Sequence, residues 1–256
     1  MTALPDLPDL PDLPQTLHTL QTLHTTPDAA GTWIYDGDVH ALRHRHGVAP
    51  QLFRYQRRLR ETPSGLVASH VTHDAAAPDA PPIIVESAVM GSDYTLRRFD
   101  AVNAQQGYSG SVTVDREGRR LQFILQRGNR TWTAQQHIDA PAVSGPSLHG
   151  HILQHWAHLA TGAAIDVRMI VLAQRTSYGF RIRQAPHAAP GRRAFTITPV
   201  RWWVRLAVAP LRVEFDEATR CVLRYEGRVP PMQRRGGGWR ALDARVDYVR
   251  HAAVYR

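Results

Sequence analysis

Apolar and polar residues alternate with a period of two along most of the chain after residue 31. In the run LFRYQRRLR, residues 52–60, the alternation places Phe53, Tyr55 and Leu59 on one face and arginine and glutamine on the other. Half-buried antiparallel strands have this pattern. It recurs in IIVESAV, RRLQFILQR, IDVRMIVL, SYGFRIR and LRVEF. The sequence therefore predicts a mainly β protein.

Turn-forming residues separate these runs. Residues 115–118 lie between GSVTV and RRLQFILQR, and residues 216–219 lie between two runs near the C-terminus, so both predict hairpins. The glycines at 236–238 predict a flexible hairpin loop. Asp36 and Gly37 form a hairpin dipeptide too, and they predict a turn between TWIY and VHALRHRH.

One strongly amphipathic helical segment interrupts the strands, PSLHGHILQHWAHLATG at residues 146–162. At about 100° per residue its apolar side chains fall within about 80° of one another, and these are Leu148, Ile152, Trp156 and Leu159. Ser144 or Ser147 is suited to cap its start, and Gly162 is suited to a left-handed end. We expect a helix over 147–160 that packs on the sheet, with Trp156 in the core.

A second, shorter helix is expected after Pro199, where PVRWWVRLAV breaks the period of two. It would carry Trp202, Trp203 and Leu206 into the core as a second wedge. The predicted fold is a strongly curved antiparallel sheet, or half-barrel. One central helix packs on its concave face, and the short second helix follows.

The first 30 residues differ from the rest. Proline stands at every third place in LPDLPDLPDLPQ, which prevents helix or central strand, and the Thr-Leu-His repeats that follow hold little apolar mass. We expect a disordered tail over 1–30 and a single β half-barrel domain over 31–256.

Charge adds one alternative function. The formal net charge is +9, and because the sequence holds no lysine, all 31 basic residues are arginine. A basic balance is typical of proteins that bind nucleic acid or another polyanion. The arginines are scattered as doublets along the chain rather than gathered on one element, which favours a solvated basic surface. Polyanion binding through this surface stays as the alternative.

The single cysteine, Cys221, excludes an internal disulfide framework and any site with several cysteine ligands. Its apolar neighbours indicate a position in a sheet rather than a reactive thiol. The sequence shows no signal peptide, no lipobox and no apolar run of about 18 residues that could span a membrane. As written it predicts a soluble cytoplasmic protein, and a start further upstream would allow a periplasmic one.

Histidine is the one abundant metal-ligating residue. A pair at i, i+4, His151 and His155, can chelate one ion, and His149 or a strand carboxylate would have to complete the site. The segment carries no glutamate to act as a general base, so surface histidines are favoured over a metal-dependent hydrolase. His40, His44 and His46 share one strand face and are metal-compatible too. No catalytic residue and no cofactor is predicted, and the balance lies against an enzyme.

The segments HWAHLATGAAIDVRMIVLAQRTSYGFRIR and VRWWVRLAVAPLRVEFDEATRCVLRYEG resemble an uncharacterised bacterial β-rich family, a domain of unknown function. The matching positions are His155, Trp156, Gly162 and residues 179–183, 202–206 and 223–227. Ala157 and Ala163 stand where the family has acidic residues. In outline the arrangement is similar to the lipoprotein-carrier half-barrel, which implies a curved sheet around a helix with an apolar groove and no chemistry to carry over.

The leading hypothesis for function is a non-enzymatic domain that binds a small apolar or amphipathic ligand between sheet and helix. Large apolar side chains gather in the segments that form this seam, although they would equally fill a core. The expected pocket residues are Trp156, Met169, Tyr178, Phe180, Trp202 and Trp203.

Overall fold

The computed structural model describes residues 33–42 and 49–251, and within them fifteen strands form one continuous sheet. The first eight strands follow one another outward from its middle. They are β1 (Trp33–Ala41), β2 (Gln51–Thr62), β3 (Gly65–Asp74), β4 (Ile84–Met90), β5 (Leu96–Asn103), β6 (Tyr108–Val114), β7 (Arg120–Arg127) and β8 (Arg130–His137). Residues 1–30, the predicted disordered tail, lie outside the described residues.

The remaining strands form the other half of the sheet. They are β9 (Ala142–Val143), β10 (Ala164–Val171), β11 (Thr176–Gln184), β12 (Arg192–Pro199), β13 (Leu211–Asp216), β14 (Val222–Arg235) and β15 (Gly238–His251). Strand β15 pairs with β1, so the two halves join at the middle of the sheet. All neighbouring strands are antiparallel except β9 and β10. The three predicted hairpins, at 115–118, 216–219 and 236–238, are confirmed.

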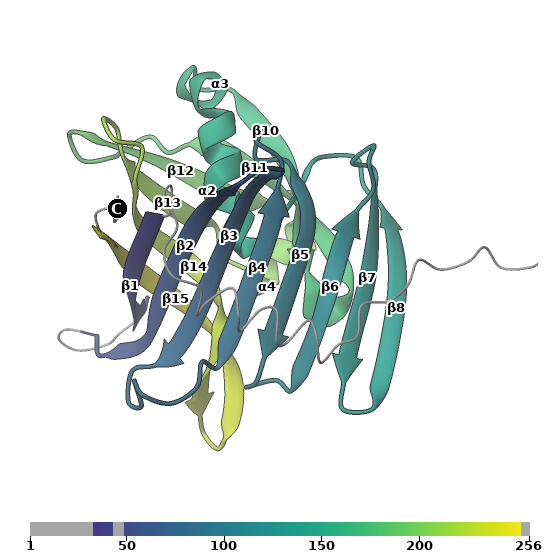
Figure 1. Cartoon of the computed structure of the whole chain (residues 1–256). Coiled ribbons are helices and arrows are strands. Elements are labelled where there is room, and N and C mark those ends of the chain that lie inside the picture. Colours follow the sequence, from purple (N-terminus) through teal and green to yellow (C-terminus); the bar gives the residue numbers. More distant parts are fainter. Residues whose placement is uncertain (1–32, 43–48, 252–256) are drawn as a thin grey trace, which may run out of the picture.

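The sheet curls until one edge faces its other half (Figure 1). There the side chain of Gln136, on β8, is bonded to Ser177, on β11. Its Oε1 accepts hydrogen bonds from the Ser177 backbone N–H at 2.7 Å and from the hydroxyl at 3.0 Å. A side chain therefore holds together two strands that share no backbone ladder. The prediction of a mainly β half-barrel is confirmed.

The predicted helix is confirmed, but it is broken into α2 (Gly145–Gln154) and α3 (Trp156–Ala160). Ser144 caps its start, and its backbone N–H donates to the Ser147 hydroxyl at 2.8 Å. At the break, Nδ1 of His155 lies 3.0 Å from the carbonyl oxygen of His151, and the backbone N–H of His155 reaches the same oxygen at 3.3 Å. A side chain that competes for a helical carbonyl bends a helix.

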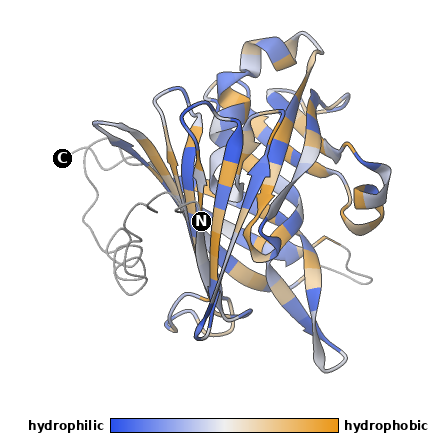
Figure 2. Cartoon of the chain, turned by 90° about the vertical axis from the view of Figure 1, so that its right-hand side faces the viewer, coloured by the Kyte–Doolittle hydropathy of each residue, from blue (hydrophilic) through white to orange (hydrophobic). Residues whose placement is uncertain are grey.

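The apolar side of α2 and α3 packs on the concave face of the sheet. Leu148, Ile152 and Leu159 are at most 2% exposed, in one cluster with residues of β1, β2 and β10–β15. Trp156 packs edge-on against Phe195 and Phe215, with ring centroids 5.2 Å and 5.6 Å apart. The alternation of hydrophobic and hydrophilic residues along the strands is visible in Figure 2. The predicted core position of Trp156 is confirmed.

The hairpin predicted at Asp36 and Gly37 is wrong, because β1 runs straight through both residues. A Cβ on Gly37 would lie 2.8 Å from Cγ1 of Val246 and 3.2 Å from the ring of Tyr248. Glycine is therefore required here by close packing against β15 and not by a turn.

The second helix forms as α4 (Trp202–Ala207), but its predicted role as a core wedge is wrong. Trp202 is 72% exposed and Leu206 is 80% exposed, whereas Val204 is buried. The single turn presents positions i and i+4 outward together, so the side that reaches the sheet carries valine. Trp203 is half-exposed and packs edge-on against Tyr178 of β11, with ring centroids 5.8 Å apart.

Candidate functional site

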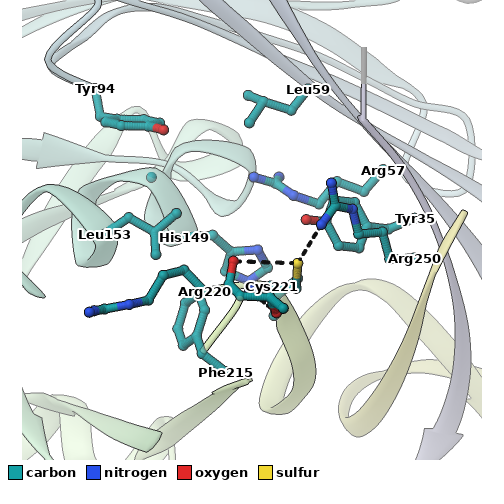
Figure 3. A pocket seen from close by; sticks show the side chains of 13 residues that line it. Tyr35, Arg57, Leu59, Tyr94, His149, Leu153, Phe215, Arg220, Cys221 and Arg250 are labelled. Atoms are coloured by element: carbon teal, nitrogen blue, oxygen red, sulfur yellow. Dashed lines mark hydrogen bonds between the residues drawn. The ribbon is translucent and has the colours of Figure 1, made fainter. Parts of the chain in front are cut away.

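A pocket of about 470 Å³ lies beside α2, where the concave faces of the two halves of the sheet meet (Figure 3). Strands β1 and β2 line one side, and β13 with the turn that follows it lines the opposite side. Helix α2 and the loop before β5 complete the wall. The curved sheet thus brings together segments more than 150 residues apart in the sequence.

The lining has an apolar part and a cationic part. Leu59 of β2, Leu153 of α2 and Phe215 of β13 supply hydrocarbon surface, together with Val222. Three arginines, Arg57, Arg220 and Arg250, supply positive charge, and none of the described residues that line the pocket is acidic. Pockets for small molecules are typically apolar with a few placed polar groups.

Arg57 is the deepest of the three arginines. On β2 it follows the inward register of Phe53, Tyr55 and Leu59, and it is 3% exposed. Its Nη1 donates to Nε2 of His70 at 2.8 Å and to the carbonyl oxygen of Pro146, in the first turn of α2, at 2.9 Å. Burial lowers the pKa of Arg57 from its ordinary value. An arginine nevertheless stays protonated in proteins, so a positive charge is buried here.

Two buried histidines stand beside this charge. Because Nη1 of Arg57 can only donate, Nε2 of His70 accepts, and the His70 proton is on Nδ1. His149 of α2 lies between Phe215 and Tyr248, and its Nδ1 has no hydrogen-bond partner in the described structure. Burial, followed by the charge of Arg57, holds the pKa of both histidines well below the usual range. Both rings are therefore neutral at neutral pH.

The other two arginines line the pocket and are exposed to solvent. The guanidinium carbon of Arg220 sits 3.9 Å from the ring centroid of Trp156, a cation–π contact. Arg220 has a left-handed φ of 60° in the turn between β13 and β14. Nη1 of Arg250, on β15, lies 2.9 Å from Sγ of Cys221. Both arginines are exposed, so ligand can reach them from solvent.

Glu86 of β4 is a separate ionisable group inside the fold. Its Oε2 lies beside the first turn of α2, 3.7 Å from where a Cβ on Gly145 would be. Burial raises the pKa of Glu86 to about 7. It forms no ion pair with Arg57 among the described residues, and it does not line the pocket. It therefore leaves the charge of Arg57 uncompensated.

None of the six residues expected to form a ligand pocket lines this one. Trp156 comes nearest, since it stacks under Arg220. Phe180 is buried in the core around α2, and Met169 and Tyr178 pack against that core. Trp202 and Trp203 lie on the exposed surface of α4.

The histidines proposed for a metal pair do come together. The ring centroids of His151 and His155 are 4.4 Å apart, and burial lowers the pKa of His151 to about 4. Within the described residues, no group of three or more His, Cys, Asp or Glu side chains is placed to hold a metal ion. On the second predicted face, Nδ1 of His40 lies 2.9 Å from the carbonyl oxygen of Ala49, whereas His44 and His46 lie outside the described residues.

The sequence did contain a signal for Arg57. In the alternation of residues 53–59, Arg57 falls on the same face as Phe53, Tyr55 and Leu59. A charged residue is unusual on such an apolar face. The sequence predicts His149 only as an added ligand of the metal pair, and no pattern in it distinguishes His70. Their meeting depends on how β3 and α2 approach each other, which no local pattern encodes.

No family model and no curated protein matches this chain. It is similar to the solved structure of a β-barrel-like protein of the domain of unknown function DUF1849 from Brucella abortus. That similarity has a TM-score of 0.44 and 9% identity, over 87% of this chain and 98% of that one. A porin-like protein from Bacteroides uniformis matches with a TM-score of 0.25 and 8% identity, over 88% of this chain and 99% of that one. The likeness to the lipoprotein-carrier half-barrel stays a prediction.

Across the described residues, no helix combines the length and the apolar character needed to cross a membrane.

Proposed function

We propose that this protein is a binding domain that takes an amphipathic small molecule in the pocket between α2 and the concave face of the sheet. The observation that carries the proposal is the two-part lining, with leucine and phenylalanine on one part and arginine on the other. An apolar wall favours a hydrocarbon chain through loss of water-exposed surface. The polar part fixes which end of the molecule faces the arginines.

The outer surface supports small-molecule binding over polyanion binding as the function. Many of its arginines bond to carboxylates, often on the same or a neighbouring strand. Examples are Arg181 with Asp166 at 2.7 Å and Arg228 with Asp243 at 2.7 Å. Arginines already bonded to carboxylates in this way have less to gain from a phosphate backbone. Arg57 of the pocket, by contrast, takes part in no ion pair of the described residues, and its two hydrogen-bond acceptors are a neutral histidine and a backbone carbonyl.

The first test is direct. Native mass spectrometry of the purified protein should detect a bound amphiphile, and calorimetry should detect binding of dodecyl-chain compounds. Leu153→Trp would place an indole in the pocket, so we expect it to weaken that binding by about 10-fold or more. Leu206→Trp adds the same indole at an exposed position of α4 and should leave affinity unchanged.

The proposal is wrong if no ligand co-purifies and no dodecyl compound binds, whatever its headgroup. It is equally wrong if Leu153→Trp and Leu206→Trp bind such compounds alike.

A further inference from the structure

We infer that the ligand carries a carboxylate or phosphate group at its polar end and that this anion binds the buried guanidinium of Arg57. The inference rests on the proposed function and names the ligand chemistry that the same pocket selects. An anionic group of this kind is found in fatty carboxylates and in phosphate-bearing lipids alike.

The first support is the isolation of the charge on Arg57. It is 3% exposed, and no ion pair of the described residues includes it. Taking a cation out of water without an anionic partner is costly, and buried charges are ordinarily paired. A ligand anion would pair with this buried cation, so its binding would offset the free-energy cost of burying the guanidinium.

The second support is the number of N–H donors of Arg57 that have no acceptor among the described residues. A guanidinium has five N–H donors, and both acceptors of Arg57, Nε2 of His70 and the carbonyl oxygen of Pro146, are bonded to Nη1. Nε and Nη2 have no bond to the described residues, and neither is a fully enclosed orphan. Figure 3 shows the guanidinium directed into the pocket. These two nitrogens form the fork that matches the two oxygens of a carboxylate or phosphate.

The third support is the charge of the surroundings. His70 and His149 are neutral, and His70 receives a hydrogen bond from Arg57 without compensating its charge. Arg220 and Arg250, which are exposed and line the same pocket, add positive charge around the place that the ligand would occupy. A cleft lined by one sign of charge attracts ligands of the opposite sign. Leu59 and Leu153 then offer apolar surface next to the anion.

Four ligands with one dodecyl chain test the inference: dodecanoate, dodecyl phosphate, dodecanol and dodecyltrimethylammonium, each below its micelle concentration. Calorimetry at neutral pH should show at least one of the two anions binding about 10- to 100-fold more tightly than dodecanol, because each hydrogen bond to a charged group adds affinity. The cation should bind weakest. A preference for dodecanoate indicates a fatty carboxylate, and a preference for dodecyl phosphate indicates a phosphate lipid.

The variant Arg57→Met should abolish this preference while its affinity for dodecanol stays within about 3-fold of the original protein's. Arg58→Met is the matched control, because Arg58 is the next residue of β2 and its side chain lies on the other face. Arg57→Lys keeps the charge but lacks the fork, and should retain part of the preference.

Three results separate the inference from the proposed function. If dodecanol binds as tightly as both anions, the inference is wrong and the proposed function stands. If none of the four compounds binds, the proposed function fails as well. If Arg57→Met keeps the preference, the anion binds elsewhere. If Arg57→Met does not fold, the comparison of ligands on the unaltered protein still tests for an anion, and Arg57→Lys tests whether Arg57 binds it: full preference in Arg57→Lys would contradict the role of its fork.

Discussion

Burial shifts the pKa values of individual residues in this protein in opposite directions, upward for an acid and downward for two histidines. Burial raises the pKa of the Glu86 carboxyl to about 7, and burial together with the charge of Arg57 lowers the pKa of His70 and His149. A raised pKa on an acid and a lowered pKa on a base have opposite effects on stability as pH changes. The two effects can therefore be separated by substituting one residue.

Glu86→Gln tests the first effect. With a pKa of about 7 against 4.5 when exposed, the folded protein binds a proton that the unfolded chain has lost. The contribution of Glu86 to the free energy of unfolding should therefore fall as pH rises from about 4.5 to 7, by no more than about 3 kcal/mol, whereas the contribution of the buried histidines rises over the same range. In Glu86→Gln this contribution is absent, so the free energy of unfolding should rise more steeply with pH over this range than in the unaltered protein. Urea unfolding at a series of pH values measures it, with Glu61→Gln, exposed on β2, as control. An unchanged pH slope in Glu86→Gln would contradict the assignment.

Single elements were predictable where one local pattern settles their burial. The helical period of Leu148, Ile152, Trp156 and Leu159 identified the buried side of α2 and α3. The same reasoning failed for α4, because one turn has no period to read and its aromatic residues lie on the surface. It failed at Gly37, because the cause is a contact with β15, about 210 residues later. The pocket could not be predicted from the sequence for the same reason. Only the curvature of the sheet brings α2 close to β2 and to the β13–β14 turn.

The two tryptophans Trp156 and Trp202 make this contrast measurable. Trp156→Ala removes a ring packed against Phe195, Phe215 and the guanidinium of Arg220, and should lower the free energy of unfolding by about 3–5 kcal/mol. Trp202→Ala removes a side chain that is 72% exposed, and should change it by less than about 0.5 kcal/mol. Chemical denaturation of both variants gives the comparison. Equal losses would mean that α4 is buried after all.

The molecule as a whole is a sheet that nearly closes on itself. Its two halves are joined in two different ways, at the middle of the sheet and where the β8 edge meets β11. Strands β1 and β15 meet through a continuous backbone ladder. Strands β8 and β11 meet through Gln136, whose Oε1 accepts from the backbone N–H of Ser177 and whose Nε2 donates to the Ser177 carbonyl oxygen at 3.3 Å. A ladder distributes its strength over many backbone bonds, whereas Gln136 supplies the hydrogen bonds between β8 and β11, beside a cation–π contact of Arg175 with Trp132 and apolar packing of Leu172.

Gln136→Ala should therefore open the contact between β8 and β11 locally. It leaves the N–H of Ser177 without its acceptor, which costs about 1–3 kcal/mol. Hydrogen exchange should speed up in β8 and β11 and stay unchanged where β1 pairs with β15, because local opening follows the weakest contacts. Gln135→Ala, on the exposed side of the same strand, should do neither. Gln136 does not line the pocket, so affinity for dodecyl ligands should survive the change. If hydrogen exchange instead rises throughout the sheet, the two halves of the sheet unfold as one unit. The contact between β8 and β11 is then no weaker than the pairing of β1 with β15.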